Sequence, residues 1–320
     1  MKSRRCSPVG QDGLCDLRAS VVNCVLPACL VSLCLIWAGG CPSKAPQDDN
    51  TPADHEAEAG DEIRNTIHEP RVENRGQTTH DARRATSDTY RIVRTWPHDP
   101  QAFTQGLDCE DGILYEGTGL YGQSSLTKRN LKTGKLLKRE LLPRRYFGEG
   151  ITVFGEKVIQ LTWQSQTGFV YDKTTFRLLN EFKYKGEGWG LTHDGKHLIM
   201  SNGSTTLRFL DPNTFAETRR VTVRDDTGPV ELLNELEFID GRIFANVLGS
   251  DSIAIIDPNS GRVMDYLDLT NLWPLSQRPS AEHVLNGIAY LPESGHLLVT
   301  GKLWPKVYEI ELTEQLSERP

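Results

Sequence analysis

The chain has 320 residues and a formal net charge of −7. This length is enough for one large β domain with an additional tail. The mild acidity, with lysine and arginine scattered and no basic stripe, argues against nucleic acid as a partner.

Residues 1–41 have the layout of an export signal peptide. Lys2, Arg4 and Arg5 give a positive start, residues 21–38 are almost entirely apolar, and small residues precede Cys41. This ending resembles a bacterial lipoprotein signal, in which Cys41 would be lipidated. Plain cleavage and an uncleaved membrane anchor are the alternatives. We expect an exported protein, either periplasmic or a membrane-anchored lipoprotein.

Residues 42–88 change composition and read as a disordered polar linker. Charged residues, Asn, Thr and Pro dominate, and large apolar residues nearly vanish. Such a segment cannot bury enough surface to offset the entropy of ordering it. Six of the seven cysteines precede this linker and only Cys109 follows it. The region after the linker therefore has no internal disulfide and no cysteine-based metal site.

Residues 89–320 contain a short pattern that returns five times. Each copy is an apolar pair followed by β-rich runs, and the copies are about forty to fifty residues apart, which is typical of propeller blades. Asp-Gly and Asn-Gly pairs between apolar runs predict hairpins. We therefore predict an all-β, five-bladed β-propeller. The last copy lacks a fourth strand, and residues 90–95 are expected to supply it. The copies begin at Gly106, Gly150, Gly190, Leu236 and Gly287.

Residues able to do chemistry stand directly before several of these starts. Equivalent positions of successive blades converge around one axis, so the repeat also predicts where a site should lie. These residues are Gln105, Glu149, Trp189, Glu235 and Asn286.

Five motifs open the blades, namely Phe103–Leu107, Tyr146–Thr152, Gly188–Thr192, Leu233–Glu237 and Leu285–Ala289. Together they closely resemble the blade openings of the plant and bacterial type of glutaminyl-peptide cyclotransferase. The resemblance spans about residues 90–312 and rests on the order and spacing of five motifs. It implies a five-bladed propeller that converts the N-terminal glutamine of peptides and proteins to pyroglutamate and releases ammonia, with no cofactor and without the zinc of the animal-type enzymes.

The resemblance also implies roles for individual residues. Glu149 would be catalytic, taking a proton from the substrate amine and giving one to the departing nitrogen. A carboxyl in this role works best with a pKa raised toward neutrality, as desolvation in an apolar setting does. Leu248 departs from the family pattern, because plant enzymes commonly carry a tryptophan there. The substrate-binding residues would be Phe103, Gln105, Phe147, Trp163, Trp189, Asn234 and Lys302.

Two other functions fit the same fold. A propeller can be a non-catalytic binding module, because fold alone does not decide function. It can also be a calcium-dependent hydrolase or lactonase, which needs oxygen ligands around the axis. Glu235, Glu237 and Asn286 could contribute to such a structural cation site, or the two glutamates could accept backbone hydrogen bonds in the channel. No oligomer signal stands out, so we expect a monomer.

Overall fold

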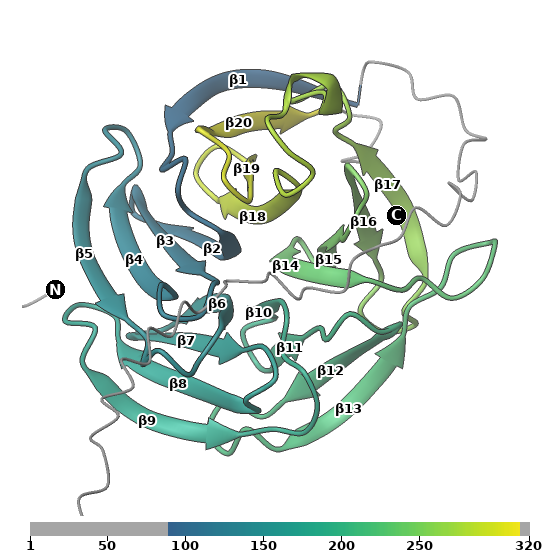
Figure 1. Ribbon diagram of the computed structural model, residues 1–320. Coiled ribbons are helices and arrows are strands. Elements are labelled where there is room, and N and C mark those ends of the chain that lie inside the picture. Colours follow the sequence, from purple (N-terminus) through teal and green to yellow (C-terminus); the bar gives the residue numbers. More distant parts are fainter. Residues whose placement is uncertain (1–88, 314–320) are drawn as a thin grey trace, which may run out of the picture. The chain divides into compact units, whose positions relative to one another are not determined.

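The computed structural model describes residues 89–313, so the predicted signal peptide (1–41) and linker (42–88) lie outside the described residues. The described part contains five sheets of four antiparallel strands each. The sheets are arranged as blades around a central axis (Figure 1). The prediction of an all-β, five-bladed β-propeller is confirmed.

In four of the blades the strands run in chain order from the axis to the rim, whereas the fifth blade takes its outermost strand from the start of the described residues (Figure 1). Blade 1 contains β2 (Thr104–Glu110), β3 (Ile113–Thr118), β4 (Ser125–Asn130) and β5 (Leu136–Leu141). Blade 2 contains β6 (Gly148–Phe154), β7 (Lys157–Thr162), β8 (Thr167–Asp172) and β9 (Leu178–Lys183). Blade 3 contains β10 (Leu191–His193), β11 (Leu198–Met200), β12 (Thr206–Leu210) and β13 (Glu217–Thr222).

The remaining strands form two further blades. Blade 4 contains β14 (Leu233–Ile239), β15 (Arg242–Val247), β16 (Ser252–Ile256) and β17 (Val263–Asp268). Blade 5 contains β18 (Leu285–Leu291), β19 (His296–Gly301), β20 (Lys306–Leu312) and β1 (Tyr90–Pro97). A single 3-10 turn in the described part, η1 (Leu275–Gln277), lies between blades 4 and 5, and no helix there is long and apolar enough to cross a membrane.

The ring closes as the sequence predicts. β1 pairs antiparallel with β20 from Tyr90 opposite Leu312 to Pro97 opposite Lys306, so the start of the domain completes the last blade. The pairing covers the edge of β20 and ties the first strand of the domain to the last blade. The loop after β1 adds a buried link, because His98 Nε2 contacts Glu116 Oε1 of blade 1 at 3.0 Å.

The hydrophobic core lies between neighbouring blades. Inner strands such as β6 and β7 are buried almost throughout, whereas the outer strands β5 and β9 are mostly exposed. Leu126 of blade 1, for example, packs in one cluster with Val158 and Phe169 of blade 2. Near the axis a Cβ at Gly106 would overlap the backbone at Ile151. Glycine at the blade start therefore allows the inner strands to approach closely.

Candidate active site

The hairpin geometry brings two sets of residues to one end of the axis. In each blade the start of the first strand pairs with the end of the second, as Gly148 with Thr162 and Leu285 with Gly301. A residue just after a second strand therefore lies beside the start of a first strand. Residues that follow second strands are Trp163, Leu248 and Lys302, and they meet those that open first strands at this end.

The strand openings share an irregularity that displays their side chains. The register of the innermost pair shifts at the start of the first strand in four blades. A bulge of this kind bends a strand and re-aims a side chain. Blade 3 differs, because Trp189 precedes its short first strand β10. The residues inside the four irregularities are Gln105, Glu149 with Gly150, Asn234 with Glu235, and Asn286 with Gly287.

An apolar wall forms at this end from the predicted residues. Phe103, Phe147, Trp163, Trp189 and Leu248 belong to one buried cluster. The ring centroids of Phe147 and Trp163 are 5.6 Å apart, and those of Phe103 and Phe147 are 6.4 Å apart, both edge to face. The structure therefore brings all four predicted aromatic residues together, with Leu248 as the smaller side chain at the departing position.

Tyr121 stands at the rim of this wall. Its ring packs edge to face on Phe147 with centroids 5.4 Å apart, and the residue is 41% exposed. Partial burial raises the pKa of the Tyr121 hydroxyl, and the charges of Glu149 and Glu187 raise it further. Both carboxylates therefore lie near enough to the Tyr121 hydroxyl to act on its charge.

The predicted polar residues are buried at the same end. Glu149 is 3% exposed, and Gln105 and Lys302 are fully buried. Lys302 Nζ lies 4.8 Å from the centre of the Phe103 ring, within the range of a cation–π contact. Asn234 Oδ1 is buried and accepts no hydrogen bond from the described residues. An orphan acceptor of this kind suits the amide N–H of a bound substrate.

The Asn286 side chain makes hydrogen bonds across the blade boundary. Its Nδ2 donates to the backbone oxygen of Thr104 at 2.9 Å and to Gln105 Oε1 at 3.4 Å. The side chain thereby links blade 5 to the opening of blade 1 and fixes which end of the Gln105 amide faces it.

Sequence reasoning missed Glu187, which holds both pocket tryptophans. Trp163 Nε1 and Trp189 Nε1 donate to the same Glu187 oxygen, Oε2, at 2.8 and 3.0 Å. Both indole N–H groups are therefore already hydrogen-bonded to this carboxylate. The only sequence signal for Glu187 was its place two residues before Trp189.

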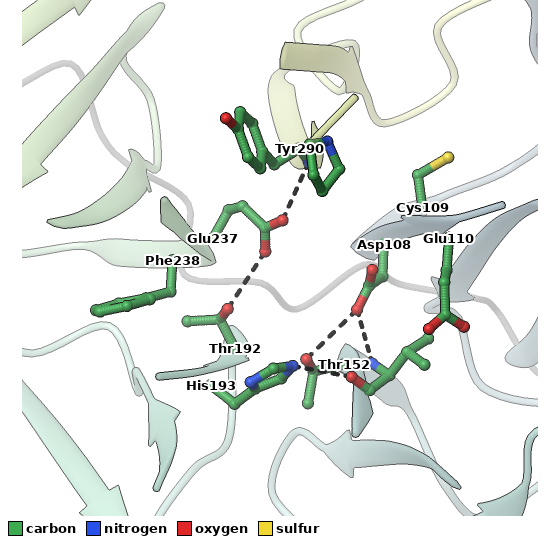
Figure 2. Close-up of a pocket in the computed structure, with 11 residues that line it drawn as sticks. Asp108, Cys109, Glu110, Thr152, Thr192, His193, Glu237, Phe238 and Tyr290 are labelled. Atoms are coloured by element: carbon green, nitrogen blue, oxygen red, sulfur yellow. Dashed lines mark hydrogen bonds between the residues drawn. The ribbon is translucent and has the colours of Figure 1, made fainter. Parts of the chain in front are cut away.

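The other end of the inner strands holds a separate cavity of about 210 Å³. Figure 2 shows its lining, in which two buried carboxylates are tied to neighbouring blades. Asp108 Oδ2 accepts the Val153 N–H at 2.7 Å, and Glu237 accepts the Tyr290 N–H at 3.0 Å and the Thr192 hydroxyl at 3.3 Å. Burial raises the pKa of both carboxyls, and that of Glu237 well above its ordinary value.

Midway along the axis, Glu235 plays the channel role that the sequence suggested. Its Oε1 accepts the Leu107 N–H at 3.1 Å and its Oε2 accepts the Ile288 N–H at 2.8 Å. Three inner strands are thus joined by one side chain. Burial, followed by the charge of Glu237, raises the pKa of Glu235 well above its ordinary value. Within residues 89–313 no group of three or more His, Cys, Asp or Glu side chains is placed to hold a metal ion.

Cys109 does not belong to the active site. Its thiol is buried, and burial together with the charge of Asp108 raises its pKa to about 12. A thiol in this condition is not a nucleophile at neutral pH. Cys109 is therefore a small packed side chain of the core.

Comparison with known proteins agrees with this geometry. A family model described as glutamine cyclotransferase matches residues 68–312. The glutaminyl-peptide cyclotransferase of Arabidopsis thaliana is 44% identical over 227 residues, which cover 70% of this chain and 71% of the relative. The crystal structure of Myxococcus xanthus glutaminyl cyclase superposes with a TM-score of 0.65 at 38% identity, covering 70% of this chain and 96% of that one. The chain therefore belongs to the glutamine cyclotransferase family.

Proposed function

We propose that this protein is a metal-independent glutaminyl-peptide cyclotransferase that uses Glu149 as its proton shuttle. The substrates are peptides or proteins with N-terminal glutamine, and the products are the pyroglutamyl peptide and ammonia. Family membership supports the activity. The single observation that carries the mechanism is the position of Glu149, a buried carboxyl in a strand irregularity beside an aromatic wall.

The reaction makes one bond and breaks another within a single residue. The α-amine nitrogen attacks the side-chain carbonyl carbon and closes a five-membered ring, and the carboxamide C–N bond then breaks. Glu149 takes the proton that the attacking amine loses and returns it to the nitrogen that leaves as ammonia. One carboxyl group therefore serves as base and then as acid, and the protons balance.

The other residues supply orientation and charge. Asn234 Oδ1, which has no partner among residues 89–313, can accept from the N–H₂ of the substrate carboxamide and fix its rotamer. Lys302, held over Phe103, can stabilise the negative charge that develops on the carbonyl oxygen. The aromatic wall contacts the substrate methylenes. Lys302 would thus polarise the carbonyl without a metal ion. A structural cation such as calcium elsewhere on the axis is a separate proposal.

The experiment uses the purified full chain with a dipeptide that begins with glutamine. We expect ammonia and pyroglutamyl dipeptide in equal amounts, at an unchanged rate after treatment with a chelator. The matched control is the dipeptide that begins with asparagine, whose shorter side chain cannot close the same ring. Absence of catalysed ammonia release would overturn the proposed activity, and loss of activity with chelator would overturn metal independence.

We also propose that the enzyme acts after export, as a monomer, either in the periplasm or as a lipoprotein anchored through Cys41. The support is the signal-like sequence of residues 1–41. Labelling of the wild-type chain with a radioactive fatty acid, but not of Cys41→Ala, is the result expected for lipidation. Equal labelling of both would contradict it.

A further inference from the structure

Glu187 lies in the connection from β9 to β10, where the chain passes from blade 2 to blade 3. Its Oε2 accepts both indole N–H groups, at 2.8 Å from Trp163 and 3.0 Å from Trp189. Its Oε1 accepts Gln164 Nε2 at 3.1 Å. One carboxylate oxygen therefore fixes two aromatic rings that come from different blades.

We infer that Glu187 is a positioning residue of the active site, which sets the planes of the Trp163 and Trp189 rings and so shapes the space for the substrate glutamine. The inference rests on the proposed function. The hydrophobic effect is non-directional, so burial alone does not specify the plane of a ring. Hydrogen bonds to an ionised acceptor are short and directional, so they hold the ring planes.

Backbone hydrogen bonds hold this segment in place but do not set the planes of the two indole rings. The Gly188 N–H donates to the Trp163 oxygen at 3.0 Å, and the Trp189 N–H donates to the Ser201 oxygen at 3.1 Å. These bonds fix the two Cα positions. The orientation of each indole about its side-chain torsions then depends on Glu187 and on packing.

The orientation of the Trp163 ring affects the catalytic carboxyl through one intermediate side chain, that of Phe147. Trp163 packs edge to face on Phe147, which directly precedes Gly148 and Glu149 at the opening of β6. A tilt of Trp163 therefore moves the wall that flanks Glu149. Ring closure needs the amine and the carbonyl carbon in near-attack geometry, so a displacement of about 1 Å can lower the rate by up to about a hundredfold.

The test separates the acceptor from the charge with two variants of the full chain. Glu187→Gln removes the charge but keeps an oxygen within reach of both indoles. Glu187→Leu keeps most of the bulk and removes the acceptor. Glu181→Leu, on the exposed outer strand β9, is the control for losing a carboxylate from the same blade. Each protein is assayed for kcat and KM with the glutaminyl dipeptide, and the indole N–H resonances are recorded by NMR and assigned with Trp163→Phe and Trp189→Phe.

For Glu187→Leu we expect kcat/KM to fall by about tenfold to a hundredfold, with the Trp163 and Trp189 indole resonances moved upfield. Glu187→Gln should keep kcat/KM within about threefold, because the amide oxygen still accepts both bonds. Glu181→Leu should match the wild type in both readouts.

Unchanged activity of Glu187→Leu, or unmoved indole resonances, would overturn the inference. If Glu187→Leu fails to fold, Glu187→Gln decides the question. Retained activity supports positioning. A fall in kcat/KM above about tenfold with unmoved resonances assigns the effect to charge and overturns the inference. The resonances report on ring positioning even if the wild type releases no ammonia, so failure of the proposed function is distinguishable.

Discussion

At the scale of single residues, the site depends on a glycine whose lack of a side chain makes room for a tryptophan ring. The turn after β11 passes directly under Trp189, where a Cβ at Gly203 would lie 2.6 Å from the ring. Gly203 also has a φ of +76°, a conformation that glycine adopts without strain. Glycine at this position therefore lets the indole pack closely against this turn.

Gly203→Ala should lower kcat/KM by about tenfold or more, because the methyl group displaces the Trp189 ring. The control is Gly155→Ala, since Gly155 also has a positive φ, +59°, but faces open space. The control should lose only about 1 kcal/mol of stability from backbone strain and keep its activity. Equal kcat/KM for the two variants would contradict the account.

The residue types of the site could be predicted from the sequence, but the contacts between them could not. Glu149 stands at a repeated blade position, whereas Asn234 and Lys302 were implied by the family resemblance, and the structure buries all three at one end of the axis. The bonds from Trp163 and Trp189 to Glu187 depend on two loops whose course no periodicity describes. A glutamate beside a glycine in a loop gives no signal of its own.

At the scale of elements, the inner strands are tied together by buried carboxylates. Glu235 accepts two backbone N–H groups, whereas Glu237 accepts one backbone N–H and one hydroxyl. A hydroxyl can turn to accept a bond, but a backbone N–H can only donate. The two glutamates should therefore respond differently to the same substitution.

Glu235→Gln should lower the free energy of unfolding by about 1–3 kcal/mol, because its N–H₂ faces a buried N–H and leaves that group unsatisfied. Glu237→Gln should be nearly neutral, since its N–H₂ can donate to the Thr192 hydroxyl while its oxygen keeps the Tyr290 N–H. Urea unfolding of the two variants measures the difference. Equal destabilisation would show that these bonds do not govern the inner strands.

The number and order of the strands could be predicted from the sequence, because turn-forming residues and β-rich runs recur together. Residues 90–95 were identified as the missing strand of the last blade, and β1 (Tyr90–Pro97) pairs with β20 there. The irregularities that display Gln105 and Glu149 were not predicted. They depend on which backbone groups of the neighbouring strand are paired, and a single strand's pattern does not contain that information.

At the scale of the whole molecule, buried titrating groups link stability to pH. Burial lowers the pKa of His98, but the charge and hydrogen bond of Glu116 raise it more, so the net shift is upward. The protonated pair thus stabilises the ring closure below the unfolded-state pKa of about 6.5, and this contribution is lost as pH rises through the folded-state pKa. Asp108, Glu235 and Glu237, whose pKa values burial raises, act in the same direction, because the folded state retains protons that the unfolded state releases.

The melting temperature should therefore fall as pH is raised above about 6.5, the unfolded-state pKa of histidine, through the raised folded-state pKa of His98. His98→Gln should lower the melting temperature at the acidic end of this range and flatten the slope, because the variant has no proton to lose there. Calorimetry of both proteins across the range measures this. A wild-type melting temperature that stays level or rises would contradict the assignment of these groups as buried and proton-retaining.

The central claim is that Glu149 moves the proton, and the most direct measurement is the rate of ammonia release by Glu149→Gln. This substitution keeps the shape of the side chain and removes its ability to exchange a proton. Its control is Glu156→Gln, on the exposed hairpin between β6 and β7. We predict that kcat falls by about a hundredfold or more for Glu149→Gln, in line with general acid–base catalysis, with the fold intact and the control unaffected. A folded Glu149→Gln protein that releases ammonia at the wild-type rate would contradict the account.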